Sequence, residues 1–117
     1  MATKYGNYCP EAGDFIWIDL DPTVGHEQSG RRPAIVLSPH NYNAAAGLCV
    51  ICPITTGVRD YPFEAKLPDA AGFRSVVLAD QPRSISWEKR PIQRAGRAPD
   101  MVLTEVRERL AALLGID

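Results

Sequence analysis

Six short apolar segments make up most of the first three quarters of the sequence, and turns containing Gly, Pro, Asn or Asp border them. The segments are rich in β-branched and aromatic residues, a composition typical of strands rather than helices. They span residues 13–20, 33–38, 48–54, 63–67, 75–79 and 83–87. Many short strands with frequent turns are typical of a small, strongly curved sheet. We therefore predict a mainly β (α+β) fold built on a compact β-barrel.

The first of these segments, residues 13–20, is almost continuously apolar. Successive side chains of a strand point to opposite faces, so Phe15 and Trp17 share one face while Ile16 and Ile18 share the other. Large apolar side chains on both faces predict a strand that is buried on both sides.

The C-terminal part of the sequence changes from the hydrophobic period of a strand to that of a helix. Between residues 101 and 114, apolar side chains recur at helical spacing, and charged side chains fill the opposite face. The apolar positions are Val102, Val106, Leu110, Leu113 and Leu114. Pro99 suits a first helical turn and Gly115 a helix end. We predict an amphipathic helix over 101–114, and shorter helices near 41–46 and 69–72.

The length of 117 residues predicts a single domain with one core, spanning residues 1–117. No stretch approaches transmembrane length, and residues 1–14 contain no apolar run of the signal-peptide kind. The three cysteines are too few for a disulfide scaffold and fit a reducing compartment. We therefore expect a cytoplasmic protein.

Two of the cysteines form a C-x-x-C motif, Cys49 and Cys52, which is a pattern found in zinc and redox sites. Residues three apart in a strand point to opposite faces, so the two sulfurs are not expected to share a metal ion. The sequence also lacks the second cysteine pair that a zinc site usually needs. We predict two buried core cysteines and no metal site.

Basic residues cluster although the net charge is only −1. Arg31 and Arg32 are adjacent, and the span 83–97 contains five cations against the single acidic residue Glu88. A guanidinium presents a planar fork of donors that matches phosphate and stacks on bases. The clusters are compatible with RNA binding, and composition alone fits a solvated charged face equally well.

The chain has two histidines, His26 and His40. A ribonuclease of the two-histidine kind uses one imidazole to accept the 2′-hydroxyl proton and another to protonate the leaving oxygen. His40 lies in a turn between Pro39 and Asn41, where we expect a structural role. His26 lies in a polar loop, where it either assists catalysis or faces solvent.

The loop 26–33 is the densest polar group in the sequence, with a carboxylate, an amide, a hydroxyl and two guanidiniums. Polar loops of this kind in small domains often carry function. Arg32 lies where the loop enters a predicted strand, which would hold its guanidinium firmly enough to stabilise charge on a phosphate. A capping or salt-bridging arginine is the alternative interpretation.

Two hydroxyl side chains, Thr55 and Thr56, stand before Gly57 at the end of the predicted strand 48–54. Hydroxyls at this position would be able to hydrogen-bond a phosphate. Thr-Thr-Gly is also an ordinary turn sequence, and the residues taken alone favour the turn.

A resemblance to the MazF/PemK mRNA interferase family of toxins begins in residues 13–38, which read GDFIWIDLDPTVGHEQSGRRPAIVLS. It continues in order through CPITTGVRDYPFEAKL (52–67), VLADQPRSISW (77–87) and APDMV (98–102). It includes the motif G-x-EQ-x-G-x-RP, formed here by Gly25, Glu27, Gln28, Gly30, Arg32 and Pro33. The resemblance therefore covers nearly the whole chain.

The resemblance implies the fold shared by MazF and the gyrase poison CcdB, and a homodimer with an RNA groove along the subunit interface. It implies an endoribonuclease that cuts single-stranded mRNA at short, defined sequences without a metal or other cofactor. The products would be a 2′,3′-cyclic phosphate and a 5′-hydroxyl. The family's catalytic Arg and Thr fall on Arg32 and Thr55, and Glu27 matches a carboxylate expected to help proton transfer.

The resemblance also implies which side chains contact RNA: His26, Gln28, Arg31, Gln81, Arg83 and Ser84. His26 and Arg31 occupy positions that vary, so they bear on the recognised RNA sequence more than on the reaction. A guanidinium is ordinarily a poor proton acceptor, so the general base stays open among Glu27, His26, Arg32 and water.

Membership of such a family further implies a MazE-like antitoxin partner, whose acidic, initially disordered tail would cover the groove. Two other functions fit the same fold, because a fold does not fix a function. One is a gyrase poison without nuclease activity, and the other is an inactive RNA-binding module. The G-x-EQ-x-G-x-RP loop together with Thr55 favours RNA cleavage.

Overall fold

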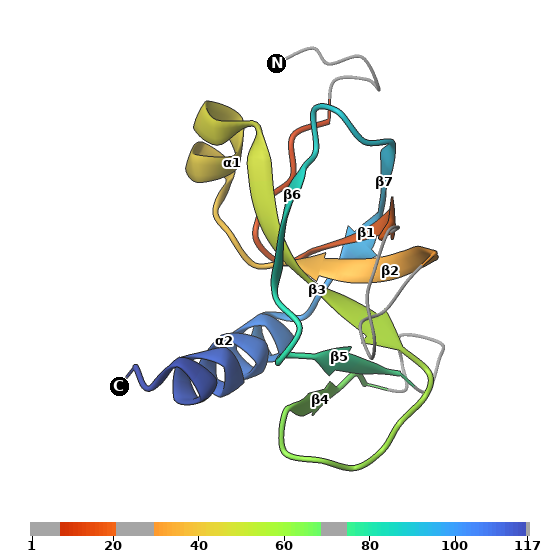
Figure 1. Cartoon of the computed structure of the whole chain (residues 1–117), viewed down its shortest axis with the longest axis vertical. Helices are drawn as coiled ribbons and strands as arrows, with labels where there is room; N and C mark the ends of the chain where they lie inside the picture. Colours follow the sequence, from red (N-terminus) through yellow and green to blue (C-terminus); the bar gives the residue numbers. More distant parts are fainter. Residues whose placement is uncertain (1–7, 21–29, 69–74, 117) are drawn as a thin grey trace.

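The computed structural model of the chain describes residues 8–20, 30–68 and 75–116. Its strands are β1 (Asp14–Asp19), β2 (Arg31–Val36), β3 (Leu48–Thr55), β4 (Glu64–Lys66), β5 (Val76–Leu78), β6 (Arg83–Ser86) and β7 (Ile92–Arg97), and its helices are α1 (His40–Ala46) and α2 (Asp100–Leu114) (Figure 1). Each of the six predicted strand segments overlaps a strand. The predicted helices near 41–46 and 101–114 are also confirmed, whereas the one at 69–72 lies outside the described residues.

The strands form one antiparallel sheet in the order β4-β5-β3-β2-β1-β7. β3 is the longest strand, and it pairs with β2 on one side and with β6 and then β5 on the other. Figure 1 shows the sheet curling around β3. The mainly β fold is therefore confirmed. Among the described residues no pairing joins β4 to β7, so the barrel is open between these two strands.

The sheet separates two hydrophobic clusters, where the sequence had predicted one core. The first contains Ile35, Leu37, Cys52, Ile54, Ala65, Leu67, Val77, Ala79, Ala98, Val102 and Val106. The second contains Ile16, Ile18, Leu20, Ala34, Val36, Cys49, Ile51, Ile85 and Trp87. Alternation along a strand sends neighbouring side chains to opposite faces, so β2 and β3 contribute to both clusters.

Cys49 and Cys52 belong to different clusters, as their spacing in a strand predicts. Both thiols are fully buried and free. Burial disfavours the thiolate and raises the pKa of each to about 12. The C-x-x-C motif is therefore a pair of core cysteines that face opposite sides of the sheet.

Helix α2 begins after Pro99 and ends at Gly115, as predicted, and Gly115 adopts the left-handed conformation that terminates many helices. Its buried stripe consists of Val102 and Val106, which pack on the first cluster. Arg107 also ties the helix to the sheet, because its guanidinium donates to the Leu37 carbonyl oxygen at 2.7 Å.

One strand was missed and one prediction about a strand was wrong. The sequence did not indicate β7, because its residues are polar and mostly exposed and it lies at the sheet edge, paired among the described strands with β1 alone. β1 was expected to be buried on both sides. Ile16 and Ile18 are fully buried, but Phe15 is half-buried and Trp17 is 39% exposed. On that side Phe15 packs against the first cluster, and both Phe15 and Trp17 line a cavity.

A candidate phosphate-binding site at the end of β3

The antiparallel pairing of β2 with β3 brings the start of one strand next to the end of the other. The register places Ala34 opposite Pro53, so the start of β2, with Arg32, and the end of β3, with Thr55, lie at the same edge of this pair. Both side chains line one cavity of about 360 Å³. The residues around it are Phe15, Trp17, Arg32, Pro33, Ile54, Thr55, Thr56, Ser75 and Ala95. The cavity therefore presents one guanidinium and several hydroxyls within a mostly apolar wall.

The Thr55 side chain is held in place by the turn that follows β3. It is only 9% exposed, and its hydroxyl oxygen accepts a hydrogen bond from the Gly57 backbone N–H at 3.0 Å. A hydroxyl that accepts in this way keeps its own hydrogen for donation to another acceptor. Thr55 can therefore donate to an anion in the cavity while its oxygen stays anchored.

Arg31 extends the site onto the surface of β1. Its guanidinium lies 5.9 Å from the centroid of the Trp17 ring, within the range of a cation–π contact. It also donates to the Gln93 amide oxygen of β7 at 3.1 Å. Trp17 thus presents an exposed aromatic face next to two cations, Arg31 and Arg32.

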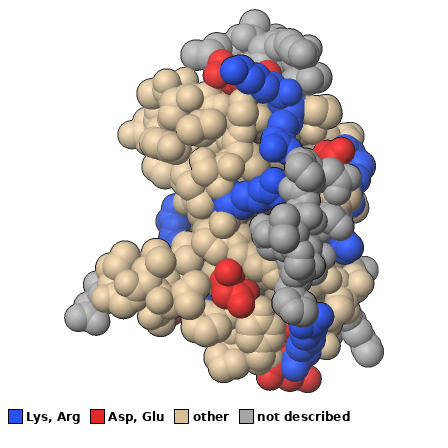
Figure 2. Space-filling view, viewed as in Figure 1, with Lys and Arg blue, Asp and Glu red and all other residues tan. Residues whose placement is uncertain are grey.

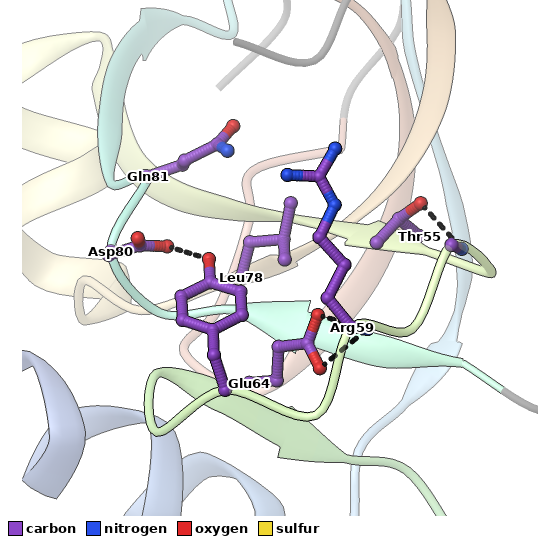
Figure 3. A pocket seen from close by; sticks show the side chains of 8 residues that line it. Thr55, Arg59, Glu64, Leu78, Asp80 and Gln81 are labelled. Atoms are coloured by element: carbon purple, nitrogen blue, oxygen red, sulfur yellow. Dashed lines mark hydrogen bonds between the residues drawn. The ribbon is translucent and has the colours of Figure 1, made fainter. Parts of the chain in front are cut away.

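Thr55 also lines a second cavity, of about 500 Å³, on the side of β3 toward β4 and β5 (Figure 3). This cavity is lined by Thr55, Gly57, Arg59, Tyr61, Glu64, Leu78, Asp80 and Gln81. Its lining is far more polar than that of the first cavity, with one guanidinium, two carboxylates, a phenol and an amide. The two cavities meet at Thr55.

Two carboxylates hold the loop between β3 and β4. The buried Glu64 accepts hydrogen bonds from the Arg59 backbone N–H at 2.9 and 3.1 Å and from the Asp60 backbone N–H at 2.7 Å. Asp80 accepts a hydrogen bond from the Tyr61 hydroxyl at 2.8 Å. Burial, this hydrogen bond and the nearby negative charge raise the pKa of Tyr61 to about 12.

A third cavity of about 260 Å³ lies beyond the second, and it brings together two residues predicted to contact RNA, Gln81 and Arg83. Gln81 lines both the second and the third cavities. Arg83 is half-buried, and its guanidinium donates to the Leu20 carbonyl oxygen at 2.8 Å. Ser84 is exposed on β6, where it pairs with Val50 of β3.

Much of the basic span 83–97 serves the fold. Arg94 and Arg97 of β7 lie 3.5 and 3.6 Å from the same carboxylate oxygen of Asp14, a residue only 1% exposed. The Arg83 guanidinium donates a hydrogen bond to a backbone carbonyl oxygen. Figure 2 shows Lys and Arg side chains in several separate groups on this face, with acidic side chains next to some of them. Several cations of this span therefore stabilise the fold and do not form one continuous basic surface.

The structure brings together only part of the predicted site. Arg32 and Thr55 share a cavity, and Gln81 lies in the cavity next to it. His40 is the exposed first residue of α1 and takes no part in these cavities. Three predicted residues, His26, Glu27 and Gln28, lie outside the described residues.

Sequence reasoning missed four residues of the second cavity: Arg59, Tyr61, Glu64 and Asp80. Three of them lie within six positions of one another, in the loop before β4 and at the start of that strand, whereas Asp80 follows β5 and is brought to them by the sheet. One signal was present, because Glu64 is an acidic residue inside an apolar segment, and a buried carboxylate needs hydrogen-bond partners.

Neither of the helices that the structure describes is long and apolar enough to cross a membrane. The described part of the chain also contains no group of three or more His, Cys, Asp or Glu side chains arranged to hold a metal ion.

Comparisons with known proteins agree on one family. The model of the PemK-like, MazF-like toxins of type II toxin–antitoxin systems matches residues 11–114. The endoribonuclease toxin MazF of Escherichia coli K12 is 43% identical over 108 residues, which are 92% of this chain and 96% of that protein. A crystal structure of MazF from Deinococcus radiodurans is 48% identical with a TM-score of 0.88, covering 94% of this chain and all of that one. A MazE–MazF structure from the same organism is 43% identical with a TM-score of 0.82, covering 95% and 100%.

Proposed function

The chain belongs to the PemK-like, MazF-like toxins of type II toxin–antitoxin systems, and we propose that it cleaves single-stranded mRNA at defined sequences without a metal ion. A relative that matches nearly the whole chain is named an endoribonuclease, which favours RNA cleavage over a gyrase poison on the same fold. The observation that carries the proposal is the cavity that Arg32 and Thr55 share.

The proposed reaction is an attack by the ribose 2′-hydroxyl on its own 3′-phosphate. The O2′–P bond forms, the bond from phosphorus to the 5′-oxygen breaks, and the products are a 2′,3′-cyclic phosphate and a 5′-hydroxyl. The pentacoordinate transition state carries more negative charge on its phosphoryl oxygens than the substrate does. Donors fixed where this charge develops lower the barrier.

Arg32 and Thr55 supply such donors. Arg32 would bind two phosphoryl oxygens through its planar fork. Thr55 would add a hydroxyl donor whose direction is set by the bond from Gly57 N–H to its oxygen. Because the wall around them is largely apolar, these hydrogen bonds would act with little competition from water.

The reaction also moves two protons, one from the 2′-hydroxyl and one to the leaving 5′-oxygen. We assign assistance in proton transfer to Glu27, since a guanidinium is a poor acceptor. A Glu27→Gln variant should lose most of its turnover while it still binds uncleaved RNA. An unchanged rate would remove Glu27 and leave His26 or water as the acceptor.

RNA binding would extend from this centre in both directions. Trp17 and Arg31 offer a stacking face and a cation on one side, and Gln81 lies on the other. Gln28, His26, Arg83 and Ser84 complete the proposed set of contacts. These side chains would select the RNA sequence.

We further propose a homodimer and a MazE-like antitoxin partner. The C-terminal end of α2 exposes Leu113, Leu114 and Ile116 next to an apolar groove, the kind of surface that a second subunit covers. A relative of known structure is a MazE–MazF complex. Sedimentation should give a dimer for the native chain, and a Leu114→Asp variant should shift it toward monomer.

The decisive experiment incubates the purified protein with a long single-stranded transcript in excess EDTA, followed by mapping of the 5′ ends. We expect cleavage at one short sequence and fragments with 5′-hydroxyl ends. Dependence on added magnesium would contradict the metal-free mechanism. An intact transcript combined with inhibited gyrase supercoiling would overturn the assignment in favour of a gyrase poison.

A further inference from the structure

We propose that the second cavity, on the Arg59 side of Thr55, is a nucleotide subsite in which Arg59 binds the phosphate next to the cleaved one. In this subsite Asp80 accepts a hydrogen bond from an exocyclic amino group of the base. The inference rests on the proposed RNA cleavage and deepens it, because it identifies residues that would determine the recognised sequence.

The position of the cavity supports this role. Thr55, which donates to the scissile phosphate in the proposed mechanism, lines both cavities, so the second begins where the first ends. A strand that places one phosphate at Thr55 therefore directs a neighbouring nucleotide into the second cavity. Its volume of about 500 Å³ lies within the range of roughly 300–1,000 Å³ found for ligand pockets.

Glu64 fixes the backbone from which Arg59 projects. The turn is unusual, because Asp60 has a φ of 57°, a left-handed conformation that few residues other than glycine adopt. Three hydrogen bonds from the Arg59 and Asp60 backbone N–H groups to the buried Glu64 carboxylate hold this turn. Such buried, charge-assisted bonds are strong and directional. Glu64 is therefore a positioning residue for Arg59.

The Arg59 side chain extends across the cavity, between Gln81 on one side and Thr55 on the other (Figure 3). The side chain is exposed. None of the carboxylates in the described part of the chain forms an ion pair with its guanidinium. Its charge is thus available to an incoming anion, and an RNA phosphate has the matching geometry.

Asp80 supplies the base-reading group. One of its oxygens accepts from the Tyr61 hydroxyl at 2.8 Å, and a carboxylate can accept further donors. A carboxylate only accepts, so it favours bases that present an amino group. It disfavours uracil, because the single N3–H donor of uracil lies between two carbonyl oxygens that a carboxylate repels. The same negative charge keeps a phosphate out of the interior, which leaves the phosphate at Arg59 and the base inside.

The first test combines protein and substrate changes. Short RNAs that contain the mapped cleavage site would carry a neutral methylphosphonate at either phosphate that flanks the scissile one. With native protein, we expect neutralisation of one of these phosphates to lower kcat/KM by roughly tenfold, the size of one charge-assisted hydrogen bond. Arg59→Ala should cause a similar loss with normal RNA. The two losses should not add, because both remove the same contact.

Lys66→Ala is the matched control, because it removes a nearby cation of β4 whose side chain is 76% exposed and forms a surface ion pair with the exposed Asp60. It should leave kcat/KM unchanged. Arg59→Lys, which keeps the charge but loses the fork, should fall between native protein and Arg59→Ala. Fully additive losses at both flanking phosphates would overturn the Arg59 assignment, as would an Arg59→Ala variant with native kcat/KM.

The second test measures base preference by cleavage of an RNA pool randomised at the nucleotides flanking the cleaved bond. Native protein should favour an amino-bearing base at one flanking position. Asp80→Asn, whose amide both accepts and donates, should relax that preference toward uracil while retaining the bond from Tyr61. An unchanged preference would overturn the role of Asp80.

Failure of the subsite proposal can be distinguished from failure of the proposed RNA cleavage. If native protein cleaves RNA in EDTA but the Arg59 and Asp80 variants behave like native protein, only the subsite is wrong. If native protein cleaves no RNA, fluorescence anisotropy with a fluorescently labelled single-stranded RNA pool of random sequence still tests the subsite. In that case, equal affinities of the native and Arg59→Ala proteins would overturn it.

Discussion

The two cavities that meet at Thr55 are built differently. The first is walled by Phe15, Trp17 and Pro33 and positions its functional groups at the ends of β2 and β3. The second has a polar lining, and a loop between β3 and β4 supplies its guanidinium. Groups on paired strands are held more precisely than groups on loops, and an apolar wall strengthens their electrostatic effect. This difference supports the proposal that the first cavity carries out the reaction and the second recognises the RNA.

The loop of the second cavity is nevertheless ordered by internal contacts. The carboxylates of Glu64 and Asp80 hold its backbone and its tyrosine, respectively. A loop fixed in this way can discriminate between bases, whereas a loose one would lose binding free energy to ordering. The comparison predicts large effects on turnover for changes in the first cavity and smaller effects on binding for changes in the second.

The largest effect should follow Arg32→Ala. Loss of a donor to the developing charge should lower kcat by roughly a hundredfold or more, with a smaller effect on RNA affinity. Single-turnover cleavage and anisotropy with an uncleavable 2′-deoxy substrate would measure the two separately. Lys66→Ala serves as the control. A variant that lost affinity but kept its kcat would show that Arg32 recognises RNA without stabilising the transition state.

Thr55 gives a cleaner test, because its hydroxyl can be removed at nearly constant shape. Thr55→Val should lower kcat by roughly a hundredfold, while Thr55→Ser, which keeps the donor, should stay within severalfold of native. Thr55→Val also leaves Gly57 N–H without its acceptor, at a cost of about 1 kcal/mol in stability. Thermal melting would confirm that the variant is folded. Equal rates for the Val and Ser variants would contradict a hydroxyl donor.

The sequence predicted those elements of the fold whose apolar residues follow a recognisable pattern. The short apolar segments correspond to β1 to β6, the amphipathic stretch corresponds to α2, and the spacing of Cys49 and Cys52 correctly separated their thiols. β7 could not be found in this way, because an exposed edge strand buries little and is held mainly by hydrogen bonds to β1. Its polar sequence is indistinguishable from that of a loop.

The residues of the candidate site also fall into two groups, those predicted from the sequence and those found only in the structure. Arg32 and Thr55 were reached through family resemblance, and the pairing of β2 with β3 explains why they meet. Arg59 and Glu64 are near neighbours in the sequence and are joined by local hydrogen bonds. Asp80 joins them only because β3, β4 and β5 are neighbours in the sheet, which spacing along the chain does not encode.

A moderate effect is expected for Trp17→Ala, which removes the exposed ring of the first cavity and the support of Arg31. Base–aromatic stacking is worth roughly 1–3 kcal/mol, so we expect an increase of about tenfold in KM and little change in kcat. Trp17→Phe should restore most of the affinity. A fall in kcat with unchanged KM would show that Trp17 shapes the reacting centre instead of binding a base. The contrast between effects on turnover and effects on binding would then no longer hold for the first cavity.

The smallest effect concerns the hydrogen bond between Tyr61 and Asp80 in the second cavity and the dependence of its stabilisation on pH. The folded protein raises the pKa of Tyr61 from 10.0 to about 12, because burial and the bond to Asp80 favour the neutral phenol. A group whose pKa is raised contributes its stabilisation fully below the unfolded value, so the native protein should melt at a slightly higher temperature than Tyr61→Phe below pH 10. This difference should shrink between pH 10 and 12 as the phenol ionises. Melting curves of the two proteins across that range would measure it. A difference that stayed constant up to pH 12 would mean that the Tyr61–Asp80 bond does not stabilise the loop, and the second cavity would then lose one of the two contacts that make it a defined site.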